Sequence, residues 1–115
     1  MNELIAGVER ELAAASAVAD PNEKWSRLER AHVLSQPSAW QHIRVHVHML
    51  RLAWRTRDGQ EIFGQLVRII LAGPGSLAGR YPVGNSGRAD VPLSANMPIA
   101  SDLAEELRRA GKRTN

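Results

Sequence analysis

The sequence of 115 residues has no cysteine, few aromatic side chains and no long apolar run. Without cysteine it cannot carry a disulfide scaffold, a thiolate metal site or a cysteine nucleophile. No stretch approaches the roughly 18 consecutive apolar residues that a membrane span needs. The first residues lack the basic segment and the apolar stretch of a signal peptide. We therefore expect a cytoplasmic protein with no membrane partner.

The composition that remains suits one folded domain. Hydrophobic residues make up 43% of the chain and charged residues 23%. A chain of this length and composition can bury a single core, which argues against wholesale disorder. We therefore expect residues 1–115 to form one domain.

Positive charge comes almost entirely from arginine. The chain has thirteen arginines and two lysines, and its net charge is +3. Residues 37–80 are the most basic segment, and Arg44, Arg51 and Arg55 within it are candidate contacts for an anion or a nucleic acid. A dedicated nucleic-acid domain concentrates more charge on one face. We expect a solvated helix face here, with nucleic acid as an unlikely partner.

Apolar residues recur at helical spacing through the first two-thirds of the chain. This periodicity predicts helices at about 3–18, 22–35, 39–56 and 60–72. The breaks between them contain Asp20-Pro21, Pro37-Ser38, Asp58-Gly59 and Gly73-Pro74-Gly75. In the last two helices we expect apolar stripes to be buried, formed by Trp40, Ile43, Val47, Leu50 and Trp54 and by Ile62, Phe63, Leu66, Ile69 and Ile70.

The four helices resemble two copies of one helix pair. The pairs end before Pro37 and Pro74, which are 37 residues apart. This spacing is close to the period of about 34 residues of tetratricopeptide helix pairs. The sequence therefore predicts an all-α fold, with two antiparallel helix hairpins stacked in tetratricopeptide-like fashion over residues 1–72.

Glycine and proline concentrate after this four-helix core. Residues 73–100 hold five of the nine glycines and four of the six prolines, together with apolar anchors. We predict an ordered, irregular arm over the helices, with a mobile tail as the alternative. In it, Gly84, Asn85 and Gly87 predict a turn with positive φ, or a loop whose N–H groups bind an anion. A C-terminal helix is predicted at 101–110, where Asp102 and Glu105 have the form of a capping box.

Resemblance to a known family lies in four stretches: LERAHVLSQ (28–36), HIRVHVHMLR (42–51), PVGNSGRADV (82–91) and MPIASDL (97–103). In residues and order they resemble a family of small bacterial proteins, the domain of unknown function 3703. The chain departs from the family pattern at Arg88, Asp90 and Ala100. The resemblance implies a compact fold and carries no activity, cofactor or catalytic residue.

Three of the four histidines fall within seven residues, and two of them share a helix face. His42 and His46 are four residues apart, whereas His48 points to the solvated side. In an antiparallel hairpin centred near Pro37, His32 lies level with His42, and Glu29 lies level with His46. The hairpin therefore predicts that one carboxylate and three imidazoles approach one seam.

Two chemistries suit Glu29, His32, His42 and His46. Glu-x-x-His and His-x-x-x-His are chelating spacings on helices, and the donor set suits a divalent ion of zinc, nickel, copper or iron. The same residues can instead form a buried hydrogen-bond network without metal, which we rank first. Simple surface histidines are the third alternative.

The leading hypothesis from sequence is a non-enzymatic interaction module. A groove between helix pairs would take a protein or peptide partner, and a homodimer is a further possibility. Metal binding by the Glu/His cluster is the first alternative, and weak nucleic-acid binding by the arginine face is the second. No serine lies in a nucleophile-elbow context, and the glycines do not form a phosphate loop, so we lean against an enzyme.

Overall fold

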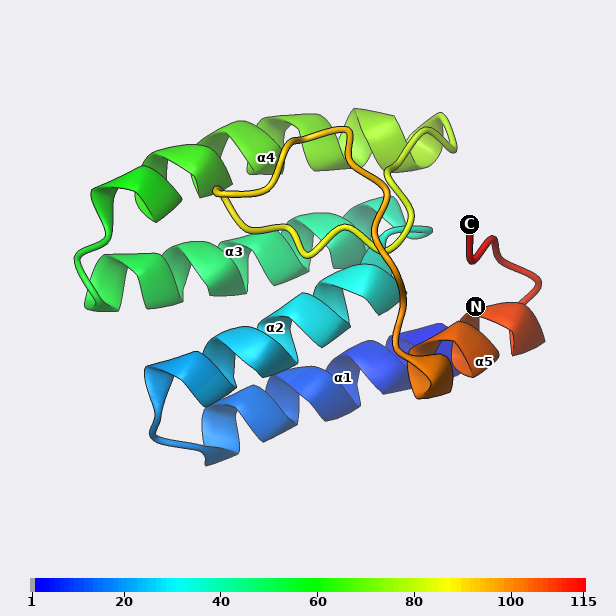
Figure 1. The fold of residues 1–115 in the computed structure, drawn as a ribbon, viewed down its shortest axis with the longest axis horizontal. Helices are drawn as coiled ribbons and strands as arrows, with labels where there is room; N and C mark the ends of the chain where they lie inside the picture. The colour runs from blue at the N-terminus through cyan, green and yellow to red at the C-terminus, as the bar shows by residue number, and fades with distance from the viewer. Residues whose placement is uncertain (1) are drawn as a thin grey trace.

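A computed structural model describes residues 2–115, and that part of the chain folds into helices without strands (Figure 1). Five helices follow one another as α1 (Asn2–Ala17), α2 (Pro21–Ser35), α3 (Ala39–Arg55), α4 (Gly59–Leu77) and α5 (Ser101–Arg109). The predicted all-α fold is confirmed.

The helices are arranged as two antiparallel hairpins, α1 with α2 and α3 with α4 (Figure 1). α2 packs against α3 and so joins the two pairs, while α5 lies on α1 and α2. The likeness to a tetratricopeptide repeat stays a prediction. None of the helices in residues 2–115 combines the length and apolar character that a membrane span requires.

Side-chain caps fix where the central helices begin. The carboxylate of Asp20 accepts a hydrogen bond from the Asn22 N–H at 2.9 Å, and Pro21 occupies the first turn of α2. Ser38 and Asp58 cap α3 and α4 in the same way, by accepting from Gln41 and Glu61. Such caps satisfy N–H groups that have no partner within the helix.

The fourth helix is longer than predicted. It continues through Pro74 to Leu77, so the irregular arm begins at residue 78 rather than 73. Proline leaves the carbonyl of Ile70 without a helical partner, but Ile70 and Pro74 lie on the exposed side, where water can satisfy it. The last turn is anchored because the Ser76 hydroxyl donates to the Gln36 carbonyl at 2.5 Å.

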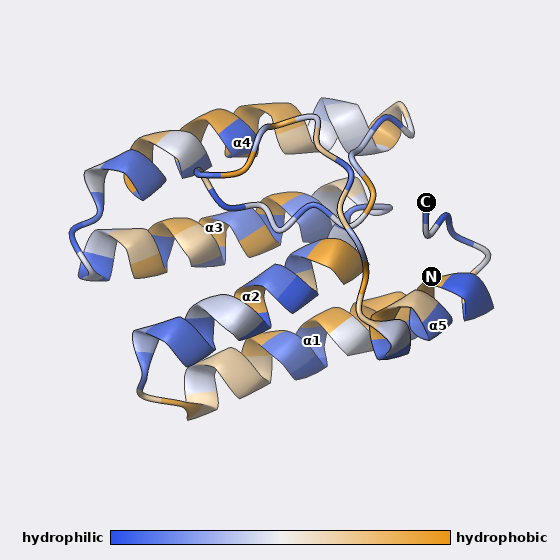
Figure 2. Cartoon of the chain, in the orientation of Figure 1, coloured by the Kyte–Doolittle hydropathy of each residue, from blue (hydrophilic) through white to orange (hydrophobic). Residues whose placement is uncertain are grey.

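The core lies mainly between α1, α2, α3 and α5 (Figure 2). The predicted burial of the α3 and α4 stripes is wrong at its largest members, because Trp40, Trp54, Phe63, Leu66 and Ile70 are exposed. The two hairpins instead meet through a face of α3 that carries His42, His46 and Met49. On α3 the side that faces the neighbouring hairpin thus carries hydrogen-bonded histidines in place of the predicted apolar stripe.

Residues 78–100 form an arm that crosses α3 and α4 and descends to α5 (Figure 1). Its middle part, from Val83 to Gly87, is buried. The Asn85 side chain donates to the carbonyls of Pro92 and Ala95, at 3.0 and 2.9 Å, which ties one part of the arm to another. The arm thus packs on the helices through residues 83–87.

The C-terminal helix starts without the predicted capping box. Its first turn follows Ala100, and no side chain caps it. The Asp102 carboxylate pairs instead with Arg30 of α2, because α5 packs across α1 and α2 through Leu103 and Leu107. Asp102 therefore forms an ion pair with another helix and does not cap its own helix.

Candidate metal centre

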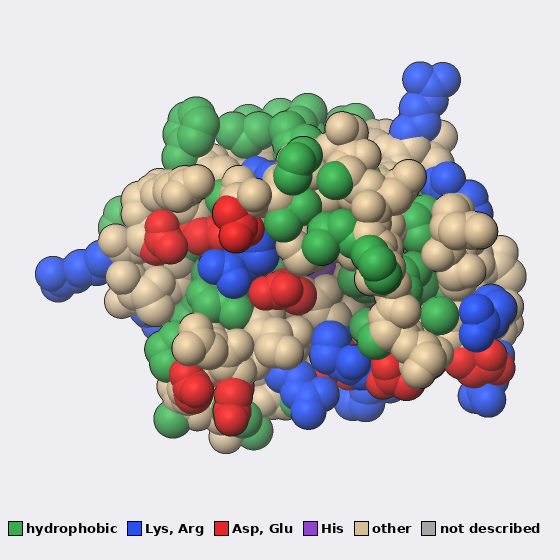
Figure 3. Space-filling model, in the orientation of Figure 1, with side chains coloured by type: hydrophobic (Ala, Val, Ile, Leu, Met, Phe, Trp, Pro, Cys, Tyr) green, Lys and Arg blue, Asp and Glu red, His purple; other side chains and the backbone are tan. Residues whose placement is uncertain are grey.

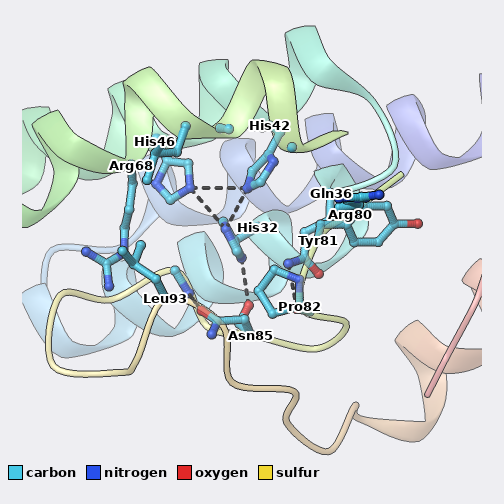
Figure 4. A pocket seen from close by; sticks show the side chains of 14 residues that line it. His32, Gln36, His42, His46, Arg68, Arg80, Tyr81, Pro82, Asn85 and Leu93 are labelled. Carbon is cyan, nitrogen blue, oxygen red and sulfur yellow. Dashed lines mark hydrogen bonds between the residues drawn. The ribbon is translucent and has the colours of Figure 1, made fainter. Parts of the chain in front are cut away.

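Three imidazole rings converge between the hairpins. α2 supplies His32, and α3 supplies His42 and His46 from successive turns (Figure 4). The Nε2 atom of His32 lies 2.9 Å from that of His42 and 3.1 Å from that of His46. The Nε2 atoms of His42 and His46 are 3.2 Å apart. All three side chains therefore present the same ring atom to one point.

The cluster is buried where α2, α3, α4 and the arm meet. His32, His42 and His46 are 3%, 6% and 2% exposed. The spacing of four residues puts His42 and His46 on one face of α3, and the antiparallel hairpin brings His32 level with them. The predicted meeting of these three imidazoles is thus present in the structure.

The remaining ring nitrogens of His32 and His46 face fixed oxygen acceptors. Nδ1 of His32 lies 2.7 Å from the backbone carbonyl of Asn85. Nδ1 of His46 lies 2.7 Å from Oε1 of Gln65, whose amide nitrogen donates to Glu61 and to the Gly87 carbonyl. These two donations fix the orientation of the Gln65 amide. Both Nδ1 atoms must therefore carry the proton and donate.

His42 is held in the same tautomer by a hydroxyl. Its Nδ1 atom lies 2.8 Å from Oγ of Ser76. The Ser76 hydroxyl hydrogen is already used, because it points at the carbonyl of Gln36. Oγ can therefore only accept from His42, and the proton of this ring also sits on Nδ1.

These hydrogen bonds leave three lone pairs pointing at one another. With every Nδ1 protonated, a neutral imidazole has no proton on Nε2. Burial lowers the pKa of His42 to about 3 and that of His46 to about 4, and it places the pKa of His32 well below its usual value. Neutral rings at pH 7 cannot bridge one another with a proton. The arrangement is satisfied by a cation at the point where the lone pairs meet.

The separations suit a first-row transition metal. With metal–nitrogen bonds of about 2.0–2.1 Å, tetrahedral coordination sets neighbouring nitrogens about 3.3 Å apart, and adjacent octahedral positions about 3.0 Å apart. The observed range of 2.9–3.2 Å matches these values within a few tenths of an ångström. Second-shell acceptors on each Nδ1 are the usual companions of metal-binding histidines.

Glu29 does not belong to this group. The candidate metal cluster contains three histidines and no carboxylate. Glu29 is half-buried beside Arg88, whose guanidinium lies 3.3 Å from its carboxylate. Arg88 also pairs with Glu61 at 2.6 Å and stacks on Trp25. Arg88, on the arm, thus pairs with Glu29. We therefore remove Glu29 from the predicted ligand set.

The glycine-rich loop packs against the histidines, and two of its N–H groups donate within the loop. The Gly87 N–H donates to the Asn85 side chain at 2.9 Å, and the Asn85 N–H donates to Pro82. Gly87 lies against the imidazole of His32, where a Cβ atom would come within 2.7 Å of the ring. A Cβ atom at Gly84, where φ is +79°, would come even closer to the carbonyl oxygen of Met97. The predicted positive-φ turn is present.

The predicted anion-contact arginines do not form one free patch. Arg44 is paired with Glu9 of α1, while Arg51 and Arg55 are exposed near the end of α3. His48 lies among them, outside the cluster. An ion pair within the protein therefore occupies one of the three predicted arginines.

Gln65 and Ser76 are the site residues that sequence reasoning missed. Both lie on α4, and Ser76 lies beyond the predicted end of that helix. A buried glutamine in an apolar helix is the one available signal, since such an amide needs partners. The match between these groups and individual histidines depends on how α4 packs on α3.

A cavity of about 130 Å³ adjoins the three rings (Figure 4). Histidine atoms are visible in a hollow at the centre of the face in Figure 3. The cavity walls also carry Gln36, Arg68 and Arg80, together with apolar side chains from α4 and the arm. The cluster therefore borders a space that connects to solvent.

Comparison with known proteins gives a family and no activity. No curated protein and no solved structure matches the chain. The pattern of the family described as "Protein of unknown function (DUF3703)" matches residues 2–107, which include the three histidines and the arm that covers them. The predicted resemblance is confirmed, and the chain belongs to the DUF3703 family.

Proposed function

We propose that this protein binds a divalent transition metal through Nε2 of His32, His42 and His46. The observation that carries the proposal is the convergence of three deprotonated ring nitrogens within 2.9–3.2 Å of one another. The hydrogen bonds to Asn85, Gln65 and Ser76 hold each ring in the binding tautomer. A metal-free network, ranked first from the sequence, would leave these lone pairs opposed.

Zinc is the first metal to test. Three neutral imidazoles are a common set of protein ligands for zinc that keeps one position open. Iron(II) sites of the oxygenase type use two histidines and a carboxylate. Since Glu29 lies apart from the cluster, the donor set favours zinc, nickel or copper over iron.

The test is metal binding by protein purified without an affinity tag of histidines. Metal content and thermal melting are measured with zinc, nickel, copper and iron, each with and without chelator. We expect one metal per chain and a melting temperature that rises with metal, since binding to the folded state stabilises it. His42→Ala and His46→Ala should each abolish both effects.

The matched control is His48→Ala, which removes an imidazole from the same helix outside the cluster. It should bind metal like the wild type. Circular dichroism of every variant checks that the helices remain folded. If wild-type protein stays metal-free and no ion raises its melting temperature, the histidines form a structural network and the proposal is wrong.

A second candidate function, self-association, is favoured by one surface. Apolar side chains, all exposed except the half-buried Val47, follow the outer side of the second hairpin, and we call this surface the α3–α4 face: Trp40, Val47, Trp54, Phe63, Leu66, Ile70 and Leu77. On each helix these residues recur at spacings of three, four or seven, which place them on one side. Hydrophobic side chains gather over α4 in Figure 3.

The exposed apolar side chains of this face favour contact with another molecule. Trp40, Trp54 and Phe63 are 68–71% exposed, and a fully buried aromatic side chain covers roughly 150–250 Å². With the aliphatic members, the face offers several hundred Å² of apolar surface, comparable with the roughly 800 Å² per partner of a standard interface. We propose that a second copy covers it, because the hairpins of two copies can pair about a two-fold axis as a four-helix bundle.

Sedimentation equilibrium over a range of concentrations tests the dimer. Trp54→Gln with Ile70→Gln should give a folded monomer that still binds metal. Leu93→Gln, an exposed apolar residue on the arm, is the control and should remain dimeric. A wild-type protein that is monomeric at all concentrations would contradict the proposal. Binding of that monomer to lipid vesicles would assign the face to a membrane surface.

A further inference from the structure

We propose that the metal held by the three histidines keeps an open coordination position on the cavity side, where it binds a small anion. This inference rests on the proposed metal-binding function. Three protein ligands leave at least one position of a tetrahedral ion free. The cavity is lined by all three imidazoles, so the free position opens into it (Figure 4).

No carboxylate or further imidazole of the described chain closes that position. Within residues 2–115, the walls of the cavity carry no aspartate, glutamate or fourth histidine. The Gln36 amide nitrogen, on the opposite wall, donates to the Pro82 carbonyl at 2.8 Å. An exogenous ligand is therefore needed to complete the coordination.

The charge of the cavity selects an anion. A divalent metal with three neutral ligands keeps its full charge, and Arg68 and Arg80 add two more positive charges to the walls. Lining carboxylates would neutralise this charge, and the described walls have none. A negative ligand is favoured at such a site because its attraction to the cations is weakly screened.

Of the two arginines that line the cavity, Arg68 gives the stronger argument for a bound anion. It is 8% exposed, and its guanidinium donates to the carbonyls of Gly64 and Val91. It forms no ion pair with a carboxylate in the described chain, and Glu61 and Asp90 act on it only at longer range. Burial lowers the pKa of Arg68. A buried cation without a paired anion is costly, and an anion in the adjoining cavity offsets that cost.

The size and lining of the cavity limit the ligand. Its volume of about 130 Å³ gives room for a small ligand beside the three rings. Apolar walls come from Leu71, Ala72 and Leu93. The chemistry therefore fits a small monoanion with one coordinating atom, such as a short carboxylate or an inorganic anion of similar size.

The experiment uses cobalt(II) in place of the native metal and azide as the probe. Cobalt bound by three imidazoles gives a visible spectrum that changes when an anion enters the coordination sphere. We expect a saturable change in wild-type protein on titration with azide, and competition by formate. Arg68→Met should weaken azide binding by about tenfold while cobalt still binds with one ion per chain. Arg55→Met, which removes an exposed arginine, is the control and should leave azide binding unchanged.

The outcomes separate this inference from the proposed function. If cobalt does not bind, the proposed function fails and takes the inference with it. If cobalt binds and 100-fold excess azide leaves the spectrum unchanged, the metal site stands and the open position is wrong. Arg68→Lys keeps a cation at this position, so it should weaken azide binding less than Arg68→Met does. An equal loss of affinity in both variants, with cobalt retained, would overturn the electrostatic role of Arg68.

Discussion

At the scale of single residues, the site depends on which ring nitrogen of each histidine carries the proton. A backbone carbonyl, an amide oxygen and a hydroxyl each accept from one Nδ1 atom. Each acceptor comes from α4 or from the arm, and none comes from α2 or α3, the helices that supply the histidines. Residues that never touch the metal therefore decide whether the three rings can bind it.

Gln65 illustrates this control and gives the first prediction. Gln65→Leu removes the acceptor for Nδ1 of His46, so the ring is free to adopt the tautomer that cannot bind. We expect metal affinity to fall by about 10–100-fold, the usual effect of losing a second-shell partner. Isothermal titration calorimetry measures it. Gln60→Leu, an exposed change on the same helix, is the control and should keep wild-type affinity.

The second prediction concerns Gly87, which packs on the His32 ring. Gly87→Ala combines a strained φ of +83° with a Cβ atom 2.7 Å from the imidazole. Gly79→Ala has a similar φ of +67° but meets no atom within 4 Å. Both changes should lower the free energy of unfolding by roughly 1 kcal/mol through strain, and only Gly87→Ala should also weaken metal binding. Equal effects of the two changes on metal affinity would show that the contact with His32 is unimportant.

At the scale of elements, local sequence signals determine where α4 begins, whereas packing determines where it ends. Asp58 starts the helix where the sequence places the break, because its carboxylate caps the Glu61 N–H at 3.1 Å. Pro74 does not end it, since the interrupted carbonyl faces solvent and Ser76 is anchored on Gln36. The additional turn carries Ser76, whose hydroxyl accepts a hydrogen bond from His42 and so orients its ring.

The third prediction follows from this cap. Asp58→Ala should lower the free energy of unfolding by about 1 kcal/mol, because the helix loses a side-chain acceptor at its first turn. Metal affinity should stay unchanged, since Gln65 and Ser76 lie well beyond that turn. Chemical denaturation measures the stability. Asp58→Asn preserves an acceptor and is expected to recover most of the loss; a loss as large as that of alanine would show that the cap is not responsible.

At the scale of the whole molecule, burying three neutral imidazoles links stability to pH. The pKa values of His42 and His46 fall to about 3 and 4, against a usual value of 6.5. Below pH 6.5 the unfolded chain therefore takes up protons that the folded, metal-free protein does not. The folded state loses stability as the pH falls through this range, and it keeps that stability above pH 6.5.

The fourth prediction is the size of this effect. As the pH falls from 6.5 to 4.5, the free energy of unfolding of the metal-free protein should fall by up to about 1.4 kcal/mol per pH unit for each of His42 and His46. Urea denaturation at several pH values, with chelator present, measures it. His42→Asn together with His46→Asn should flatten the curve. A wild-type curve that is already flat over this range would contradict burial of neutral rings.

The sequence by itself determined the helices and the pairing of their histidines. Periodicity, caps and turn residues are local signals, and they place every helix start within one residue of the observed one. The predicted starts of α3 and α5 coincide with the observed starts. The spacing of four between His42 and His46 needs only a helix, and their meeting with His32 needs only a short antiparallel connection.

Tertiary structure alone decided which helix face was buried and which polar partners met. Apolar periodicity does not reveal whether a stripe meets a core, so Trp40 and Trp54 were assigned to the interior although they lie at the surface. Glu29 has a chelating spacing, but the arm places Arg88 beside it. The residues that orient the histidines come from distant parts of the sequence: Gln65, Ser76 and Asn85. Only the packing of α4 and the arm on α2 and α3 brings these residues to the rings.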